Sequence, residues 1–356
     1  MPTRSPDEVP ADRPGKTPAG RVTVHQVAAL ARVSTATVSR ALAGTGSVTE
    51  LLRRRVVDAA ATLNYRPNRA ARSLRIRRSL TVGVLIPDIQ NFFFTGIVRG
   101  LEQVLHEEGY TYLLGNSDGA AERERLYIDT LRDEGAAGFI IVPSERGNRS
   151  YRALQDSGVP IVMLDRTAPG LSVDQVNVTN QEGVRTAVRH LIQLGHRRIG
   201  YIGGPSALNV ARERLAGYEQ ALEEAGLPMD PALVRPGDFQ QAGGLAATEA
   251  LLNLSPRPTA MFAANNLMTL GAFEALHRRR MVIPDDVAIV GFDDLPWATS
   301  LQPPLTAVAQ PTFELGVAAA QLLLARLRDP RRPFRRVVLD TVLIVRGSCG
   351  APRSGS

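Results

Sequence analysis

Apolar positions recur at helical spacing in two adjacent segments near the beginning of the chain. The spacing predicts a short first helix, whose apolar face consists of Val24, Val27, Ala28 and Ala31. Ser34 then offers a side-chain oxygen that can cap a second helix beginning at Thr35. This second helix would bury Val38 and Leu42 and turn outward Thr35, Ala36, Ser39 and Arg40.

Small, polar and guanidinium side chains at the exposed start of a short helix suit the major groove of DNA. On periodicity alone, an ordinary helical hairpin whose polar face meets only water stays open as an alternative. A third helix is expected from Thr49 to Leu63, capped by Thr49, and it would close a small core over the first two. Its apolar face consists of Leu52, Val56, Ala59, Ala60 and Leu63.

A basic segment follows these three helices. Pro67 ends the preceding structure, and Asn68 can cap one or two further helical turns. The segment carries Arg69, Arg72 and Arg75, with Ala71 and Leu74 on one side. A helix this short is not stable alone, so we expect it to order on DNA and to wedge Leu74 into a minor-groove base step. A solvated basic linker is the alternative.

The distribution of charge supports a nucleic-acid partner. The chain holds 42 Lys and Arg against 35 Asp and Glu, a net charge of +7. Residues 1–80 hold 15 basic and 5 acidic side chains, whereas the rest of the chain holds 27 and 30. A basic module attached to a nearly neutral body is typical of a DNA-binding protein. Only Lys16 is a lysine; a biased composition explains the preference for arginine, but not its clustering.

From Leu80 the pattern changes to strands alternating with helices. Residues 80–86 form a continuous apolar run, as a buried parallel strand requires, and a helix is expected at about residues 96–108. Further strands are expected at Tyr110–Leu114, Gly138–Val142, Ile161–Leu164, Arg198–Gly203, Ala260–Ala264 and Ala288–Phe292. This alternation predicts a doubly wound α/β fold.

The α/β region contains an internal repeat. Residues 100–109 and 217–226 share Gly, Glu, Gln, Leu, Glu and Gly at identical offsets. We interpret this as two similar halves in tandem, with a ligand cleft between them at the carboxyl ends of the strands and closure as the natural motion. Convergence of two amphipathic helices is the alternative.

Aromatic and polar residues follow the expected strands. Asn91 to Phe94 follow the first strand in a loop, and three consecutive aromatic residues there cannot all enter the core. The other residues at or near strand ends are Asp165, Arg166, Arg212, Arg214, Phe239, Asn265, Asn266, Asp293 and Asp294. Aromatic faces, guanidinium groups, amides and carboxylates in one cleft suit a polyhydroxylated ligand such as a sugar. A loop cap or a surface ion pair is the alternative for each residue.

Residues 22–78 resemble the DNA-binding region of the LacI/GalR family of bacterial transcription regulators, and the similarity extends over nearly all of residues 21–349. The matching stretches are V-T-V-H-Q-V-A, V-S-T-A-T-V-S-R-A-L and L-N-Y-R-P-N-R-A-A-R-S-L. The resemblance implies a three-helix helix-turn-helix domain, a hinge helix, and a body of two Rossmann-like subdomains similar to periplasmic binding proteins. It also implies a homodimer on a pseudo-palindromic double-stranded DNA operator, with both hinge helices in the central minor groove.

The resemblance assigns roles to individual residues. Bases would be read by Thr35, Ala36 and Arg40, and phosphates would be held by His25, Ser34, Thr37, Ser39 and Asn68. The hinge contacts would be made by Arg69, Ala71 and Leu74. The effector cleft would be lined by Phe93, Phe94, Ser144, Asp165, Arg214, Phe239, Asn265, Asp293 and Gln310.

The chain departs from the family pattern at two places. The family often has Asn-Pro-Phe-Phe where this chain has Phe92 after Asn91, and often Asn-Asp where this chain has Asn266 after Asn265. Both departures leave the identity of the ligand more open. The chain ends soon after Cys349 without the leucine-repeat tail that forms tetramers in the family, so we expect a dimer.

The expected domains follow from these patterns. They are a disordered tail (1–20), the helix-turn-helix domain (21–66), the hinge helix and linker (67–79), an N-terminal effector subdomain (80–178 with 308–339), a C-terminal effector subdomain (179–307 with 340–349), and a second tail (350–356).

Three other classes of protein fit the sequence less well. A nicotinamide-dependent enzyme would need Gly-x-Gly-x-x-Gly before a helix, which the first strand lacks. The histidines are scattered, so we expect no catalytic set, no metal and no cofactor. A transporter's solute-binding protein would not carry the basic module and would need a signal sequence. An architectural DNA protein would leave the cleft unexplained.

We therefore interpret the chain as a transcriptional regulator, and specifically as a repressor whose operator binding is controlled by a small-molecule effector, a sugar or sugar derivative.

No apolar run reaches about 18 residues, the length of a membrane span. A single cysteine excludes an internal disulfide. With no apolar signal region at its start, the protein is expected in the cytoplasm.

Overall fold

The computed structural model describes residues 22–43, 48–65, 79–144 and 149–350. It divides the chain into an N-terminal unit, residues 1–78, and a body, residues 79–356. The expected hinge residues Asn68, Arg69, Ala71 and Leu74 lie outside the described residues, as do both expected tails apart from Gly350.

The N-terminal unit contains the three helices that the periodicity predicts. They are α1 (Val24–Ala31), α2 (Thr35–Ala43) and α3 (Glu50–Thr62). Their shared core consists of Val27, Ala28, Ala31, Val38, Ala41, Val56, Ala59 and Ala60. Thr49 occupies the capping position of α3, but its side chain makes no capping hydrogen bond.

The turn between α1 and α2 is held by backbone and side-chain hydrogen bonds. Arg32 adopts the left-handed conformation with φ 52°, and its N–H bonds carbonyls of the last turn of α1. The N–H of Thr37 donates to the Ser34 hydroxyl at 3.1 Å, which confirms the predicted cap. Arg55 donates from α3 to the carbonyl of Ala31 at 2.7 Å. These contacts fix the direction in which α2 leaves α1.

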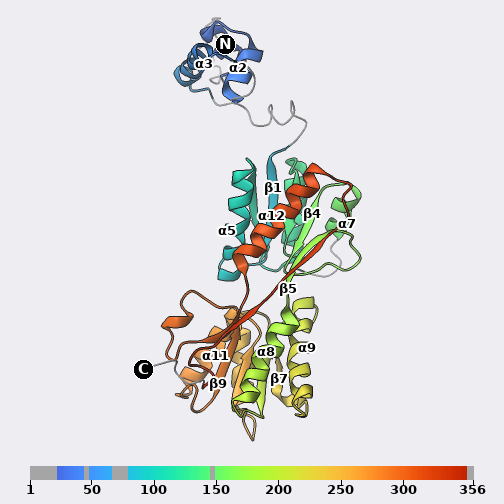
Figure 1. Cartoon of the computed structure of the whole chain (residues 1–356), viewed down its shortest axis with the longest axis vertical. Coiled ribbons are helices and arrows are strands. Elements are labelled where there is room, and N and C mark those ends of the chain that lie inside the picture. The colour runs from blue at the N-terminus through green and yellow to red at the C-terminus, as the bar shows by residue number, and fades with distance from the viewer. Residues whose placement is uncertain (1–21, 44–47, 66–78, 145–148, 351–356) are drawn as a thin grey trace, which may run out of the picture. The chain divides into compact units, whose positions relative to one another are not determined.

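The body consists of two six-stranded sheets (Figure 1). The first has the strand order β11-β5-β4-β3-β1-β2 and is parallel throughout. Its strands are β1 (Thr81–Ile86), β2 (Thr111–Asn116), β3 (Gly138–Ile141), β4 (Ile161–Leu164), β5 (Asp174–Val178) and β11 (Arg336–Leu339). Parallel strands with helices between them confirm the doubly wound α/β prediction.

The second sheet has the equivalent order β12-β10-β9-β8-β6-β7, in which only the β10–β12 pair is antiparallel. Its strands are β6 (Ile199–Gly203), β7 (Val234–Pro236), β8 (Ala260–Ala263), β9 (Ala288–Phe292), β10 (Thr306–Ala309) and β12 (Val342–Ile344). Buried side chains line both faces of its central strands, as a sheet covered by helices on both sides requires.

Helices cover both sheets. The first half contains α5 (Phe92–Glu107), α6 (Ala121–Asp133), α7 (Arg149–Asp156) and α12 (Thr312–Arg328). The second half contains α8 (Asn180–Gln193), α9 (Asn209–Glu224), η1 (Pro231–Leu233), α10 (Gln241–Leu252), α11 (Asn266–Arg278) and η2 (Ala298–Ser300). Among the described residues, no helix combines the length and the apolar character that crossing a membrane requires.

Two expectations about these helices were wrong. The first helix of the body begins at Phe92 and not near Gly96, because Asn91 caps it and the three phenylalanines form its first turn rather than a loop. Arg212 and Arg214, which were expected at or near a strand end, lie inside α9.

The chain passes between the two halves at three places, visible in Figure 1 where the ribbon joins the lobes of the body. The connections run from β5 to α8, from β10 to α12, and from β11 to β12. Because β10 pairs with β9 through Val308 and with β12 through Ala309, both residues belong to the second sheet, and the second connection follows Ala309. The expected boundary before residue 308 was therefore too early.

The repeated segments occupy equivalent places in the two halves, since α5 and α9 each follow the first strand of a sheet. A Cβ added at Gly100 would lie 2.0 Å from the carbonyl oxygen of Phe313, and one added at Gly217 would lie 2.2 Å from that of Gln181. Each glycine thus lets its helix approach a neighbouring helix closely. This shared role favours tandem halves over convergence.

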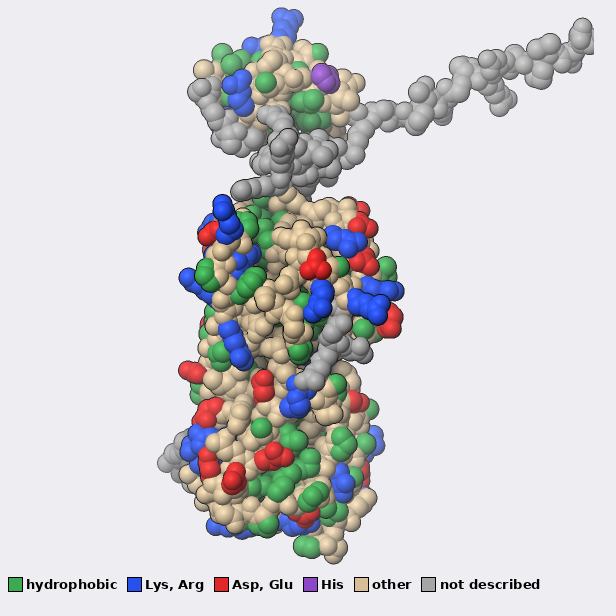
Figure 2. Space-filling view, turned by 90° about the vertical axis from the view of Figure 1, so that its right-hand side faces the viewer, with side chains coloured by type: hydrophobic (Ala, Val, Ile, Leu, Met, Phe, Trp, Pro, Cys, Tyr) green, Lys and Arg blue, Asp and Glu red, His purple; other side chains and the backbone are tan. Residues whose placement is uncertain are grey.

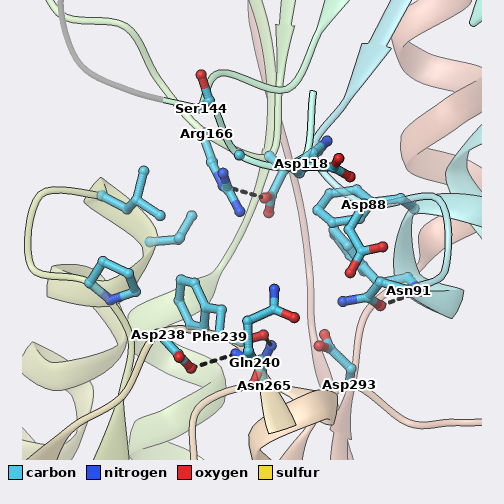
Figure 3. Close-up of a pocket in the computed structure, with 18 of the residues that line it drawn as sticks. Asp88, Asn91, Asp118, Ser144, Arg166, Asp238, Phe239, Gln240, Asn265 and Asp293 are labelled. Atoms are coloured by element: carbon cyan, nitrogen blue, oxygen red, sulfur yellow. Dashed lines mark hydrogen bonds and ion pairs between the residues drawn. The ribbon is translucent and has the colours of Figure 1, made fainter. Parts of the chain in front are cut away.

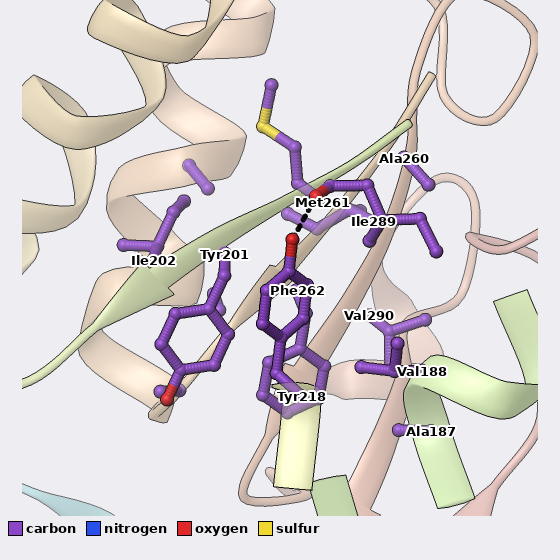
Figure 4. Close-up of a cluster of buried hydrophobic side chains, with 14 of the residues drawn as sticks. Ala187, Val188, Tyr201, Ile202, Tyr218, Ala260, Met261, Phe262, Ile289 and Val290 are labelled. Atoms are coloured by element: carbon purple, nitrogen blue, oxygen red, sulfur yellow. Dashed lines mark hydrogen bonds between the residues drawn. The ribbon is translucent and has the colours of Figure 1, made fainter. Parts of the chain in front are cut away.

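The core of the second half is rich in aromatic side chains (Figure 4). The rings of Tyr201 and Phe262 stack with centroids 6.0 Å apart. Tyr218 packs beside them and donates from its hydroxyl to the carbonyl of Ile199 at 2.8 Å. This packing fixes β6, β8 and α9 relative to one another, and therefore the strand ends that face the other half.

Candidate functional site

A cavity of about 660 Å³ lies between the two halves at the carboxyl ends of their strands (Figure 3). All nine residues expected at an effector cleft line it, namely Phe93, Phe94, Ser144, Asp165, Arg214, Phe239, Asn265, Asp293 and Gln310. In Figure 3, Arg166 faces Phe239, Asn265 and Asp293 across the cavity, whereas the hydroxyl oxygen of Ser144 points away from them. We call this cavity the central pocket.

Asp165 brings a carboxyl group from the first half into the central pocket. It directly follows β4 with φ 62°, and its N–H bonds the carbonyl of Val176 at 2.9 Å. Its Oδ2 lies 3.7 Å from Nε of Arg166, whereas its buried Oδ1 accepts no hydrogen bond from the described residues. Burial raises the pKa of this carboxyl group, and the charges of Arg166 and Arg214 oppose that rise.

Asp293 brings a carboxyl group from the second half. It directly follows β9 with φ 77°, and its N–H bonds the carbonyl of Val308 at 2.8 Å. Oδ1 accepts from the side chain of Gln310, and Oδ2 accepts from the N–H of Asn266 at 3.2 Å. Burial raises its pKa, while the charge of Arg214 and these hydrogen bonds lower it.

Arg214 supplies a fixed guanidinium group from α9. Nε donates to Asn180 at 2.9 Å and Nη1 donates to the carbonyl of Ala264 at 2.7 Å. The guanidinium carbon lies 3.8 Å from the ring centre of Phe292 and 5.9 Å from that of Phe239. With 4% of its surface exposed, this side chain is held in one orientation.

Asn265 joins two elements of the second half. Its Oδ1 accepts from the N–H of Met268 at 2.9 Å and so caps α11, and its Nδ2 donates to the carbonyl of Phe239 at 2.9 Å. Phe239 has φ 64°, so Asp165, Phe239 and Asp293 all adopt the left-handed region. Non-glycine residues held in this region are typical of functional sites.

Phe93 and Phe94 form an aromatic wall in the first half. The N–H of Phe93 donates to Oδ1 of Asn91 at 3.0 Å, so the capped start of α5 fixes both side chains. Their rings meet edge to face with centroids 5.0 Å apart. Both are buried, whereas Phe92 is 54% exposed. The aromatic triplet is therefore divided between the central pocket and the surface.

Other residues that line the central pocket were not among the nine expected there. Two of them, Asn91 and Arg166, had been named at strand ends. The others had not been named: Pro87, Asp88, Ile89, Gln90, Asn116, Asp118, Gly119, Pro205, Ala207, Leu208, Val210, Asp238 and Gln240. The rim residues carry no local signal, because only the packing of the two halves brings them to the cavity.

Among the described residues, two hydrogen bonds link the halves beside the central pocket. Nδ2 of Asn266 donates to Oδ1 of Asn91 at 2.7 Å, and the N–H of Thr167 donates to Oδ1 of Asn209 at 3.0 Å. Asn266 and Phe92 are the two departures from the family pattern noted above. The first now makes a direct bond between the halves, and an aspartate there could not donate it.

In the N-terminal unit, the expected DNA contacts that the structure describes lie on the surface around α2. His25, Ser34, Ala36 and Arg40 are exposed, and Thr35, Thr37 and Ser39 are partly exposed. Nε of Arg40 lies 3.4 Å from the carbonyl of Ala36, one turn earlier on the helix. An exposed helix start carrying small polar side chains and one arginine has the chemistry for reading base edges.

Both regions match known protein families. Residues 23–68 match the profile of bacterial regulatory proteins of the lacI family, and residues 188–349 match the profile of a periplasmic binding protein-like domain. The HTH-type transcriptional repressor CytR of Escherichia coli (strain K12) is 36% identical over 329 residues, which cover 92% of this chain and 96% of that protein. The ribose operon repressor of Haemophilus influenzae is 34% identical, with coverage of 92% and 98%.

Several solved structures of regulatory proteins are also similar to this chain. The lac repressor dimer bound to operator and the anti-inducer ONPF has a TM-score of 0.83 at 29% identity, covering 93% of this chain and all of that one. A complex of the transcriptional regulator CelR with cellobiose has a TM-score of 0.71 at 37% identity, covering 92% and 100%. A LacI family regulator from Enterococcus faecium with bound ribose has a TM-score of 0.69 at 31% identity, covering 75% and 98%.

A basic helix-turn-helix unit and a two-sheet body with a ligand-sized pocket define a DNA-binding regulatory protein. The chain belongs to the lacI family of bacterial regulatory proteins.

Proposed function

We propose that this protein is a repressor that binds a pseudo-palindromic operator as a homodimer, and that a sugar in the central pocket controls this binding. The observation that carries the proposal is the convergence of aromatic, amide, carboxyl and guanidinium groups from both halves on one cavity. Such groups match the faces and hydroxyls of a sugar. Relatives named as repressors, and neighbours that hold ribose or cellobiose, support it.

The proposed roles divide DNA binding from ligand binding. Thr35, Ala36 and Arg40 read base edges, and the nine assigned pocket residues hold the sugar. The hydroxyls around the start of α2 and His25 hold phosphates, which set the register of the helix on DNA. As a regulator of genes, the protein would work on DNA in the cytoplasm.

The proposed coupling is a shift of populations. A sugar that contacts both halves favours one angle between them, and this angle determines whether the two DNA-binding units of the dimer fit the operator. Coupling of this kind is typically about 1–3 kcal/mol, or roughly 5- to 150-fold in operator affinity.

The test uses the full-length protein and an operator selected from a random DNA pool. Operator Kd is measured by fluorescence anisotropy with and without D-ribose, cellobiose and a panel of other sugars. We expect one sugar to change Kd within that range, and Asp293→Ala to abolish the change while leaving the sugar-free Kd intact. Glu223→Gln, an exposed change on α9, serves as the control. A panel in which no sugar binds or changes Kd would overturn the proposal.

DNA reading has its own test. Arg40→Ala should reduce discrimination between the selected operator and single-base variants by about 1–3 kcal/mol. Arg54→Ala, which removes the same charge from an exposed position of α3, should leave discrimination unchanged. Equal weakening on all sequences by Arg40→Ala would contradict a base-reading role.

A further inference from the structure

The loop between α12 and β11 is strongly basic. Residues 328–336 read Arg-Asp-Pro-Arg-Arg-Pro-Phe-Arg-Arg, with five arginines against one aspartate. Residues 81–356 as a whole hold 27 basic and 30 acidic side chains, and the two kinds are interspersed on the face of the body that Figure 2 shows. Residues 328–336, which we call the basic loop, therefore differ in charge from the body that carries them.

The basic loop lies at the end of the first sheet that is opposite to the central pocket. β11 begins with Arg336 at the edge of the sheet and runs parallel to β5, so the loop precedes the amino end of a strand. β1 also begins at this end, directly after the segment that connects the N-terminal unit to the body (Figure 1). The N-terminal unit is therefore joined to the body at the end of the sheet that carries the basic loop.

A buried ion cluster anchors the basic loop. Asp174, at the start of β5, is fully buried, and its carboxylate lies 3.0 Å from Nε of Arg326 and 2.9 Å from Nη2 of Arg332. Its Oδ1 also accepts from the N–H of Arg335 at 2.9 Å. One buried carboxylate thus binds α12 and both the side chain and the backbone of the loop.

Arg326 holds the backbone of the loop at further points. Its Nη1 donates to the carbonyl of Pro330 at 3.2 Å and to that of Arg332, and its Nη2 donates to the carbonyl of Pro333 at 3.1 Å. Its guanidinium carbon also lies 4.4 Å from the ring centre of Phe334. A backbone tied in this way has little freedom left to lose on binding, which favours recognition by the side chains that it presents.

Three arginines of the basic loop are exposed and unpaired. The side chains of Arg331, Arg335 and Arg336 make no ion pair or hydrogen bond with any residue that the structure describes. The acidic side chain of the loop, Asp329, bonds the backbone N–H of Arg331 at 3.1 Å, and Arg328 is paired with Glu108. Like charges held in one short loop repel one another, and a bound polyanion would remove that repulsion.

Duplex DNA is the polyanion that fits both the place and the chemistry. The chain belongs to a family of DNA-binding regulators, and its N-terminal unit is joined to the body at this end. A duplex presents one negative charge per about 1.7 Å of its axis, and a guanidinium group matches the geometry of a phosphate. An acidic protein surface rarely presents charges so densely.

We propose that the basic loop binds phosphates of the duplex that flanks the operator. The body then adds a contact that does not depend on sequence to the base-reading contacts of the N-terminal unit. This inference goes beyond the proposed function, because it assigns a second DNA-binding surface and holds whether or not a sugar controls the protein.

The first experiment compares two duplexes on the full-length protein. One carries only the selected operator, and the other extends it by two helical turns, about 20 base pairs, on each side. Fluorescence anisotropy measures Kd over a range of KCl concentrations. At about 0.1 M salt we expect the longer duplex to bind at least about tenfold more tightly, and the slope of log Kd against log salt to be steeper by about 2, as one phosphate contact per protomer of a homodimer predicts. Flanks of unrelated sequence should give the same gain.

Variants test whether the basic loop causes this gain. Arg331→Gln/Arg335→Gln/Arg336→Gln removes three exposed charges that have no partner among the described residues, so we expect the fold to be retained. The gain from flanking DNA should be lost, whereas Kd for the short operator should be unchanged. Lysine at the same three positions keeps the charge and should retain most of the gain, because lysine also binds phosphate. A glutamine variant that gains as much as the wild type would overturn the inference.

A matched variant separates the basic loop from net charge. Arg189→Gln/Arg257→Gln/Arg280→Gln removes three exposed charges from the second half, and its gain from flanking DNA should equal that of the wild type. An equal loss of gain in both glutamine variants would overturn the inference, and binding of the short operator by each variant would leave the proposed repressor standing. If no operator can be selected at all, the proposed repressor fails, and the inference fails with it.

Discussion

Asp165 and Asp293 occupy the same position in the two halves, yet their side chains are held differently. Each follows the equivalent strand, adopts a positive φ, and donates its N–H to the next strand of its sheet. The carboxylate of Asp293 is bonded by Gln310 and by the N–H of Asn266, whereas Oδ1 of Asp165 has no partner among the described residues. The same backbone position thus carries one carboxyl group with both oxygens hydrogen-bonded and one with an oxygen that lacks a described partner.

The same difference extends to other residues of the central pocket. In the second half, both ends of the Asn265 amide are bonded and Arg214 is fixed on two sides. In the first half, Ser144 Oγ and Nε of Arg166 lack partners within the described part of the chain. The second half therefore presents polar groups that are already fixed, whereas the first half retains buried polar atoms that lack a partner among the described residues. Such a division limits the ordering that binding requires.

The largest expected effect is a loss of stability, and it tests whether the repeated glycines have the same role in both halves. Gly100→Ala and Gly217→Ala should each lower the free energy of unfolding by about 3 kcal/mol or more, because the added Cβ meets a carbonyl oxygen of the adjoining helix. Chemical denaturation of each variant measures this.

The helix-ending glycines of the same repeats provide the control. Gly109 and Gly226 have positive φ and open space around an added Cβ, so alanine there should cost only about 1–2 kcal/mol. A large loss at Gly100 combined with none at Gly217 would show that the repeat does not have the same role in both halves.

A smaller effect should distinguish the second half, whose pocket side chains are hydrogen-bonded, from the first half, where several polar atoms are unpaired. Asn265→Ala removes a helix cap and leaves the carbonyl of Phe239 without its donor, and should cost about 1–3 kcal/mol of stability. Ser144→Ala removes a hydroxyl without a described partner, and should change stability by no more than about 0.5 kcal/mol. Equal stability losses would remove the distinction between the halves.

The smallest effect concerns the two aspartates themselves. Asp165→Asn should raise stability at pH 7 by about 1 kcal/mol, or roughly 2–4 °C in Tm, because the buried carboxylate is costly and one of its oxygens is unpaired. Asp293→Asn should lower stability, because an amide nitrogen would face a donor, either Gln310 or the N–H of Asn266.

The advantage of Asp165→Asn should depend on pH. Folding raises the pKa of Asp165, so the native state holds this proton more tightly than the unfolded chain. The wild type therefore loses stability relative to the variant as pH rises from the ordinary value of 3.8 through the raised pKa. Thermal unfolding of both proteins from pH 4 to pH 8 measures the difference. A constant difference across this range would contradict the assignment.

The sequence predicted the strands whose residues are apolar throughout. Residues 161–164 and 288–292 were expected as strands and form β4 and β9 with those bounds. The strands β5, β7, β10, β11 and β12 were missed. β5 begins with Asp174, which is fully buried because Arg326 and Arg332 reach it from more than 150 residues away. No local pattern reveals such a pairing.

The sequence predicted which types of residue line the site, but it did not predict which residues they contact. Strand ends bearing Asp, Asn, Arg and Phe pointed to the residues that line the central pocket, because parallel strands bring their carboxyl ends to one edge. The partners of those residues depend on long-range packing, as in the bond between Asn91 and Asn266. Phe92 to Phe94 were misread as a loop although Asn91 is a common helix cap.

The three connections between the halves restrict how the body can signal. The links from Val178 to Asn180, from Ala309 to Thr312 and from Leu339 to Val342 are all short. Three short tethers oppose sliding or separation of the lobes, and they leave bending about a common axis as the accessible motion. Ligand binding in the central pocket would then change the angle between the two lobes rather than the distance between them. Binding of a sugar of suitable shape would then change the tilt of one rigid lobe relative to the other.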